Sequence, residues 1–254
     1  MRGSDWVANA RAWIAWVGHD PHREAFLDSA VTTALGRVRG RRWLDAGCGE
    51  GRLSRWLAQR GATVLGVDAS APLVAAARRR SPAAFRKRLR YEVSDLAAPG
   101  LVPRGALDGV LCMLALQHVA RPARVLKAWA RALKPGGRVL VVLPHPCFMA
   151  PGTTWEATLP AVPRGRPQIG ALRVPSYPAR GRTVFRFDPA FPAATVNHHF
   201  SLETLSLALR TSGFLTARLL EPRPPSRLVA RDPAWEPYGR VPFFLLWEAV
   251  RAPL

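Results

Sequence analysis

A short glycine-rich stretch, DAGCGEG at residues 45–51, has the composition of a loop that binds a nucleotide-like ligand. Gly47, Gly49 and Gly51 stand at every second position, and glycine allows positive φ and places no Cβ between the main chain and a bound molecule. The spacing is GxGxG, one residue shorter in its last gap than the GxGxxG of dinucleotide-binding enzymes. The loop therefore predicts a nucleoside-containing ligand other than a nicotinamide dinucleotide.

Two acidic residues follow at the ends of the next apolar runs. Asp68 ends VLGVD, 17 residues after Gly51, and a carboxylate there can accept hydrogen bonds from both hydroxyls of a ribose. Asp95 ends YEVSD, where its carboxylate can accept from an adenine amino group. Either acid alone could instead cap the next helix. Together with Asp45 and the glycines, the two acids predict an adenosine site.

Short apolar runs alternate with amphipathic runs around these residues, as strands alternate with helices in a parallel α/β sheet covered on both faces. The carboxyl ends of such strands share one edge of the sheet, so the glycine loop and both acids are expected to meet there. We expect strands at 42–47, 62–70, 89–95, 106–114 and 138–146, and helices at 51–61, 71–80 and 121–137.

Four segments are expected along the chain. Residues 1–40 are predicted to form an N-terminal helical lid, and residues 41–143 the ligand-binding core. Residues 144–200 read as a proline-rich insert without regular structure that covers the substrate, since ten of the 24 prolines lie between Pro144 and Pro192. Residues 201–254 are expected to complete the core with a helix capped by Ser201 and two strands.

The stretch from residue 41 to residue 143 resembles the class I S-adenosylmethionine-dependent methyltransferases in its glycine loop, its two acids and the LKPGGRVLV run. The resemblance implies a Rossmann-like α/β fold with a seven-stranded sheet in the order 3-2-1-4-5-7-6, strand seven antiparallel and helices on both faces. It implies S-adenosyl-L-methionine as cofactor and S-adenosyl-L-homocysteine as product.

The resemblance also assigns roles within the cofactor site. Asp45 and the main chain of Ala46, Gly47 and Gly49 are expected to hold the methionine part. Asp68 is expected to bind the ribose, and Asp95 with Leu96 the adenine. The cofactor-binding residues that the resemblance implies are Asp45, Ala46, Gly47, Cys48, Gly49, Asp68, Ala69, Ser70, Asp95, Leu96, Cys112 and Met113, the last two placed just past strand four at the methionine end.

The second half is similar to small-molecule methyltransferases related to quinone biosynthesis and found in secondary metabolism, on the residues HPCF, NHHFSLETLSLALRTSGF and LLEPRP. Members often have His-Arg where this chain has His199 and Phe200, so an arginine that could meet an acidic substrate is absent at this position. The reaction implied is methyl transfer to an oxygen or nitrogen nucleophile of a small molecule.

A histidine is suited to act as the base for such a nucleophile, because its ordinary pKa of about 6.5 leaves it neutral near pH 7. His145 is the first choice, since LPHP places it at the end of the fifth expected strand. His198 and His199, expected to begin the helix after the insert, are the other candidates. His145 could also hydrogen-bond the following loop, and His118 is expected to pack at the start of a helix.

The net charge of +20 raises an alternative, an RNA-modifying or RNA-binding protein on the same fold. Of the 37 basic residues 34 are arginines, spread along the chain except in 78–90, a pattern also typical of coding bias. A third hypothesis is a cofactor-binding protein that no longer transfers methyl or that uses the sulfonium in another way. No apolar run of membrane-spanning length, signal peptide or cysteine pair for metal is found, so we expect a cytoplasmic monomer or homodimer without metal.

Overall fold

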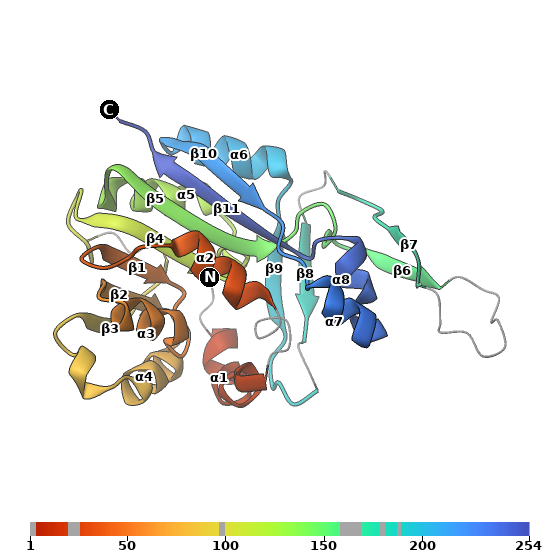
Figure 1. Ribbon diagram of the computed structural model, residues 1–254, viewed down its shortest axis with the longest axis horizontal. Coiled ribbons are helices and arrows are strands. Elements are labelled where there is room, and N and C mark those ends of the chain that lie inside the picture. Colours follow the sequence, from red (N-terminus) through yellow and green to blue (C-terminus); the bar gives the residue numbers. More distant parts are fainter. Residues whose placement is uncertain are drawn as a thin grey trace.

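The computed structural model describes residues 4–19, 26–96, 100–157, 169–177, 181–186 and 189–253. Its central sheet has seven strands: β1 (Arg42–Ala46), β2 (Thr63–Asp68), β3 (Leu89–Val93), β4 (Leu107–Met113), β5 (Leu133–Pro144), β10 (Phe214–Leu220) and β11 (Phe244–Arg251). Their order is β10-β11-β5-β4-β1-β2-β3, as Figure 1 shows. β1 to β5 pair in parallel, whereas β11 is antiparallel to both β5 and β10. The predicted sheet order is therefore confirmed, with β10 and β11 as the sixth and seventh strands.

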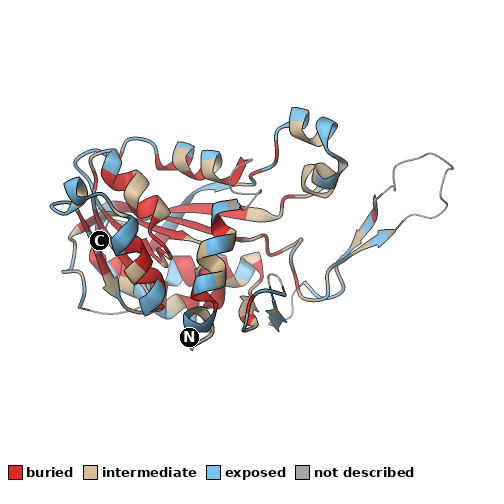
Figure 2. Ribbon diagram, turned by 90° about the horizontal axis from the view of Figure 1, so that it is seen from below, coloured by how far each residue is buried: buried red, intermediate tan, exposed pale blue. Residues whose placement is uncertain are grey.

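Helices cover both faces of this sheet (Figure 1). One face packs on α2 (Asp28–Leu35), α3 (Arg52–Gln59) and α4 (Ala71–Arg80), and the other on α5 (Pro122–Ala132) and α6 (Leu202–Thr211). Neighbouring residues of one strand belong to different cores, since Trp43 packs on the first face and Leu44 on the second. Figure 2 shows the strands and the inward helix faces as buried, which explains why the parallel strands are apolar on both sides.

The proline-rich insert forms regular structure, contrary to expectation. It contains β6 (Thr154–Ala157), β7 (Ile169–Arg173), β8 (Gly181–Phe185) and β9 (Thr195–His199), paired antiparallel as β6 with β7 and β8 with β9. None of these strands contains proline, so every residue in them retains an N–H for pairing. The β6–β7 hairpin projects from the body of the molecule in Figures 1 and 2.

The first residues form α1 (Ser4–Trp16) and a short turn of helix, η1 (Val17–His19). The side chain of Asn9 ties α1 to the insert, because its Nδ2 donates to the carbonyl of Ala193 at 2.8 Å and its Oδ1 accepts from the N–H of Ala193 at 2.9 Å. The predicted N-terminal helices are present, but only α1 reaches the edge of the sheet where the strands end, while α2 packs in the core. The other short elements are η3 (Ala83–Phe85), η4 (Leu116–His118), α7 (Ser226–Arg231), η5 (Pro233–Trp235) and α8 (Glu236–Arg240).

The helix that follows the insert begins directly after its predicted cap, Ser201, so the expectation that His198 and His199 begin it was wrong. Ser201 caps α6, since its Oγ accepts from the N–H of Thr204 at 3.2 Å. His198 and His199 are thus the last residues of β9 and do not begin a helix. Within the part of the chain that the structure describes, no helix combines the length and apolar character needed to cross a membrane.

Candidate functional site

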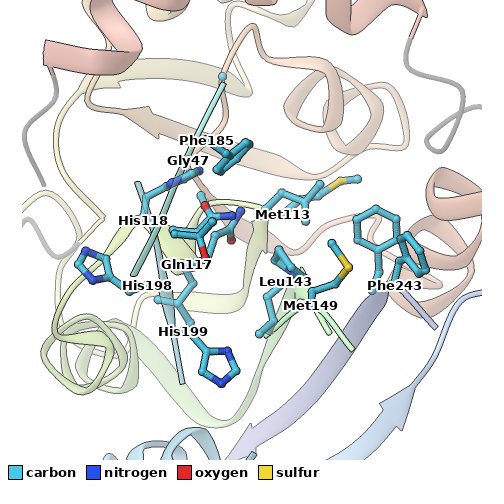
Figure 3. Close-up of a pocket in the computed structure, with 18 of the residues that line it drawn as sticks. Gly47, Met113, Gln117, His118, Leu143, Met149, Phe185, His198, His199 and Phe243 are labelled. Carbon is cyan, nitrogen blue, oxygen red and sulfur yellow. The ribbon is translucent and has the colours of Figure 1, made fainter. Parts of the chain in front are cut away.

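One cavity of about 700 Å³ lies at the carboxyl ends of β1, β2, β4 and β5. Its wall is completed by α1, by the loop after β5 and by residues of β6 to β9. Figure 3 shows how side chains from η4, β5, β8 and β9 converge on it. Cavities of roughly 300–1,000 Å³ hold drug-sized ligands, so this one has room for a nucleoside and for part of a second molecule.

The glycine loop forms one end of the cavity, and its three glycines have different reasons to lack a side chain. All three have positive φ, at 80° for Gly47, 55° for Gly49 and 82° for Gly51. A Cβ on Gly47 would lie 2.3 Å from the Cβ of Ala115, and one on Gly51 would lie 2.4 Å from the hydroxyl of Tyr91. A Cβ on Gly49 would meet no atom closer than the Trp13 indole nitrogen at 3.8 Å. Only Gly49 therefore leaves open space for a ligand, whereas the other two permit close packing of protein on protein.

Asp45 and Asp68 line the same end of the cavity. Burial raises the pKa of Asp45 to about 7, although Ser54 donates a hydrogen bond to its carboxylate. Asp68 accepts from the N–H of Gly49 and from the N–H of Ser70, each at 2.9 Å, and burial raises its pKa as well. Asp45 is buried and Asp68 is half-buried, and two such carboxylates in one cavity favour a ligand with positive charge and hydrogen-bond donors.

The structure brings most of the predicted cofactor residues to this cavity. Ala46 and Ser70 are buried beneath the loop and contribute no side chain to the lining. Ser70 instead donates from its Oγ to the carbonyl of Trp6 at 3.0 Å, which ties α1 to the end of β2. The predicted residues that line the cavity are Asp45, Gly47, Cys48, Gly49, Asp68, Ala69, Leu96 and Met113.

Two predicted cofactor residues lie elsewhere. Cys112 and Met113 are the last residues of β4, not residues beyond it, and their side chains point to opposite faces of the sheet. Cys112 is fully buried in the core below α5, because strand alternation allows only one of the two to face the cavity. Asp95 is exposed and lines a smaller hollow on the α5 side together with Leu96.

His145, the first choice as base, does not line the cavity. Its Nδ1 accepts from the N–H of Cys147 at 3.2 Å, which leaves the ring proton on Nε2 to donate to Glu221 at 3.1 Å. Burial lowers the pKa of His145, and Glu221 partly opposes that shift. Both ring nitrogens are engaged within the protein, so His145 joins the ends of β5 and β10 and is withdrawn as a candidate base.

His198 and His199 do line the cavity. The Nε2 of His199 donates to the carbonyl of Tyr177 at 2.8 Å, and in Figure 3 its ring points away from Met113 and Gln117. The ring of His198 stacks on Phe200, and burial lowers its pKa. Both histidines are positioned by the insert, at the end of the cavity away from the glycine loop.

His118 and Gln117 also line the cavity, a placement that the sequence did not indicate. They belong to η4, which follows β4, and β4 pairs with β1, the strand before the glycine loop. The Nδ1 of His118 bonds the carbonyl of Val196 at 2.8 Å and is therefore the protonated nitrogen. Burial lowers the pKa of His118, so its neutral form, with a free lone pair on Nε2, is favoured.

Three tryptophans of α1 cover the cavity. The ring of Trp6 meets the His118 ring edge-on at a centroid distance of 5.2 Å, and Trp13 lies over the glycine loop. The ring centroids of Trp13 and Trp16 are 5.4 Å apart. One helix therefore encloses both the glycine end of the cavity and the histidine beside η4. No group of three or more metal-ligating side chains is found in the described ranges.

Comparison with known proteins shows that this chain is similar to methyltransferases. A family model described as a methyltransferase domain matches residues 44–141. The ubiquinone biosynthesis O-methyltransferase of Paracidovorax citrulli is 33% identical over 172 residues, which cover 66% of this chain and 70% of that protein. The enzyme of the same name from Alkalilimnicola ehrlichii is 38% identical over 115 residues, 43% of this chain and 44% of the relative. An S-adenosylmethionine-dependent methyltransferase from Mesorhizobium loti has a crystal structure that matches with a TM-score of 0.74 and 31% identity, over 88% of this chain and 96% of that one.

Proposed function

The chain belongs to the class I S-adenosylmethionine-dependent methyltransferases, and on that premise we propose that it methylates an oxygen nucleophile of a small molecule. The observation that carries the proposal is a single cavity that extends from the glycine loop to a buried neutral histidine, His118, under the tryptophans of α1. The relatives named O-methyltransferase support oxygen as the nucleophile.

The residues at the glycine end fit S-adenosylmethionine. Gly49 leaves space where a side chain would stand, and the carboxylates of Asp45 and Asp68 suit a cation and hydroxyl donors. We assign the methionine part to Asp45 with the loop main chain, and the ribose to Asp68. When bound, S-adenosylmethionine supplies a methyl group already activated by its sulfonium sulfur.

The protein's own residues then have three tasks. The cavity aligns the acceptor with the cofactor, which is the largest contribution available when the methyl group needs no further activation. The tryptophans of α1 exclude water from the reacting atoms. His118 takes the proton of the acceptor hydroxyl on Nε2, because its Nδ1–H is already committed to the carbonyl of Val196. His118 thereby replaces His145 as the proposed base.

The structure gives the RNA alternative little support. The basic cluster Arg78, Arg79 and Arg80 lies in the last turn of α4, and none of the three lines the cavity. The first turn of α4 stands beside Asp68, and a helix of ten residues is about 15 Å long. The length of the helix thus separates the cluster from the proposed reaction site. The tryptophans of α1 also cover the cavity.

Incubation of the purified protein with S-adenosylmethionine labelled in its methyl group tests the proposal. A set of hydroxylated aromatic compounds and total RNA are supplied in parallel, and label is measured in each fraction. We expect S-adenosylhomocysteine to form with label in the small-molecule fraction as an acid-stable ether. Label found only in RNA, or RNA binding with a steep salt dependence alongside such label, would favour the alternative.

A further inference from the structure

Two amide oxygens in the cavity have no hydrogen-bond partner. The Oε1 of Gln117 and the Oδ1 of Asn197 are buried from solvent and unpaired within the described part of the chain, and both residues line the cavity. Gln117 as a whole is 9% exposed. An acceptor atom left in this state is destabilising, so a ligand that donates a hydrogen bond to it gains affinity.

The fold places these two amides in η4 and β9, the two elements that meet at His118. Gln117 precedes His118 in η4, and Asn197 follows Val196 in β9. The hydrogen bond from the His118 ring to the Val196 carbonyl at 2.8 Å joins the two elements, so both amides are fixed next to the proposed base. In the view of Figure 3, Gln117 and His118 lie between Gly47 and His199.

The surroundings of the amides select against a methyl acceptor with negative charge. Arg52 is the single lysine or arginine among the described lining residues, and its guanidinium is paired with Asp28 near the glycine loop. The formal negative charges of the lining, on Asp45, Glu50 and Asp68, also belong to the glycine end. A carboxylate in the other half would therefore be buried without a cation to pair with it.

Aromatic side chains make up much of the wall around the amides. Trp6 contacts the His118 ring, and Phe185 of β8 also lines the cavity. Flat apolar surfaces of this kind favour a ring that can stack or pack edge-on. The two unpaired amide oxygens of this half accept hydrogen bonds, and the aromatic wall suits a ring.

We propose that Gln117 and Asn197 determine acceptor specificity and select a neutral aromatic molecule that donates hydrogen bonds, of which a phenol is the simplest form. The inference rests on the proposed function, since it places the acceptor beside His118. The hydroxyl of a phenol bonds an amide oxygen and so fixes the ring beside His118. A ring with a second hydroxyl also donates to Nε2 of His118, because the bond to the amide orients that hydroxyl.

Calorimetric titration of the protein saturated with S-adenosylhomocysteine tests the proposal with three probes of matched shape. 1-Naphthol donates a hydrogen bond, 1-methoxynaphthalene does not, and 1-naphthoate carries a negative charge. We expect 1-naphthol to bind about tenfold more tightly than 1-methoxynaphthalene, and 1-naphthoate to bind most weakly.

Two substitutions locate the selectivity. Gln117→Met keeps the length of the side chain and removes its oxygen, so the preference for 1-naphthol over 1-methoxynaphthalene should fall to less than about threefold. Asn197→Leu serves as a second, independent variant, with thermal melting to establish that each is folded. Gln59→Met, in the last turn of α3 at an exposed position, is the matched control and should keep the full preference.

Equal binding of the three probes, tightest binding of 1-naphthoate, or an unchanged preference in folded Gln117→Met and Asn197→Leu proteins would overturn the inference. In each of these outcomes S-adenosylhomocysteine still binds, so the proposed function stands. Failure of S-adenosylhomocysteine to bind at all would instead overturn the proposed function, and the inference with it.

Discussion

Replacing Asp68 by alanine should weaken cofactor binding, because this carboxylate holds the glycine loop and is assigned to the ribose. It accepts from the N–H groups of Gly49 and Ser70, each at 2.9 Å. A hydrogen bond to a charged group contributes about 1.5–3 kcal/mol, so the two together amount to roughly 3–6 kcal/mol. We expect this loss to appear in the free energy of unfolding, since both bonds are present without ligand. The affinity for S-adenosylhomocysteine should fall separately, because the carboxylate assigned to the ribose is lost.

Calorimetry separates the two parts. Titration with S-adenosylhomocysteine should show at least about a tenfold rise in Kd for Asp68→Ala, which corresponds to about 1.4 kcal/mol, and thermal melting should show the loss of the two loop hydrogen bonds. Asp68→Asn keeps one acceptor oxygen and loses the charge, so its Kd should fall between those of the wild type and Asp68→Ala.

Asp108→Ala is the matched control. Asp108 also accepts two hydrogen bonds, from the N–H of Arg42 at 2.7 Å and from Lys134 at 2.6 Å, but it lies at the amino end of β4, the opposite edge of the sheet. This control should change Kd by no more than about twofold. The reasoning is refuted if Asp68→Ala binds as tightly as the wild type, or if Asp108→Ala weakens binding as much.

Four further outcomes follow from the site. Gly47→Ala should lower the melting temperature more than Gly105→Ala, because both have positive φ, a cost of about 1–2 kcal/mol for an L side chain, but only Gly47 also meets another side chain at 2.3 Å. Affinity for S-adenosylmethionine should rise between about pH 6 and pH 8 in titrations that also detect proton release, because a cation beside Asp45 lowers its pKa from about 7. His118→Ala should reduce kcat by about 10²–10⁴-fold in the methyl-transfer assay and should also lower the melting temperature, because the Val196 carbonyl loses its partner, whereas His145→Gln should lower the melting temperature and spare kcat. Burial lowers the pKa of His145 in the folded state, so the unfolded chain binds a proton at this residue more readily. The contribution of His145 to the free energy of unfolding is therefore fully present above about pH 6.5 and is lost as the pH falls toward the folded pKa. This part of the pH dependence should be absent from His145→Gln melting curves.

Local patterns in the sequence were sufficient for the sheet and the glycine end of the site. Two features of the glycine end are set by residues close in the sequence: the positive φ of Gly47, Gly49 and Gly51, and the carboxylate at the end of β2. The parallel order of the strands then brings the strand ends together. The alternation of side chains along β4 could also have shown that Cys112 and Met113 face opposite sides.

The acceptor end depends on contacts between distant parts of the chain. The strand-end position of His145 predicted its edge of the sheet correctly, but its side chain turns toward Glu221, 76 residues later. The ring of His118 is oriented by its hydrogen bond to the carbonyl of Val196, 78 residues later. Val196 lies in β9, and the pairing of β8 with β9 was not predicted because the segment is rich in proline. Neither partner could be found by periodicity or spacing.

A single chain of hydrogen bonds runs from the cover of the cavity to its floor. The carbonyl of Trp6 accepts from Ser70, the N–H of Ser70 donates to Asp68, and Asp68 accepts from Gly49. Movement of the first turns of α1 away from the sheet would therefore break the bond from Ser70 to Trp6, and Ser70 is the residue that donates to Asp68. We therefore expect the residence time of a bound molecule to depend on how often the contact between Trp6 and Ser70 breaks, as well as on the molecule's own contacts.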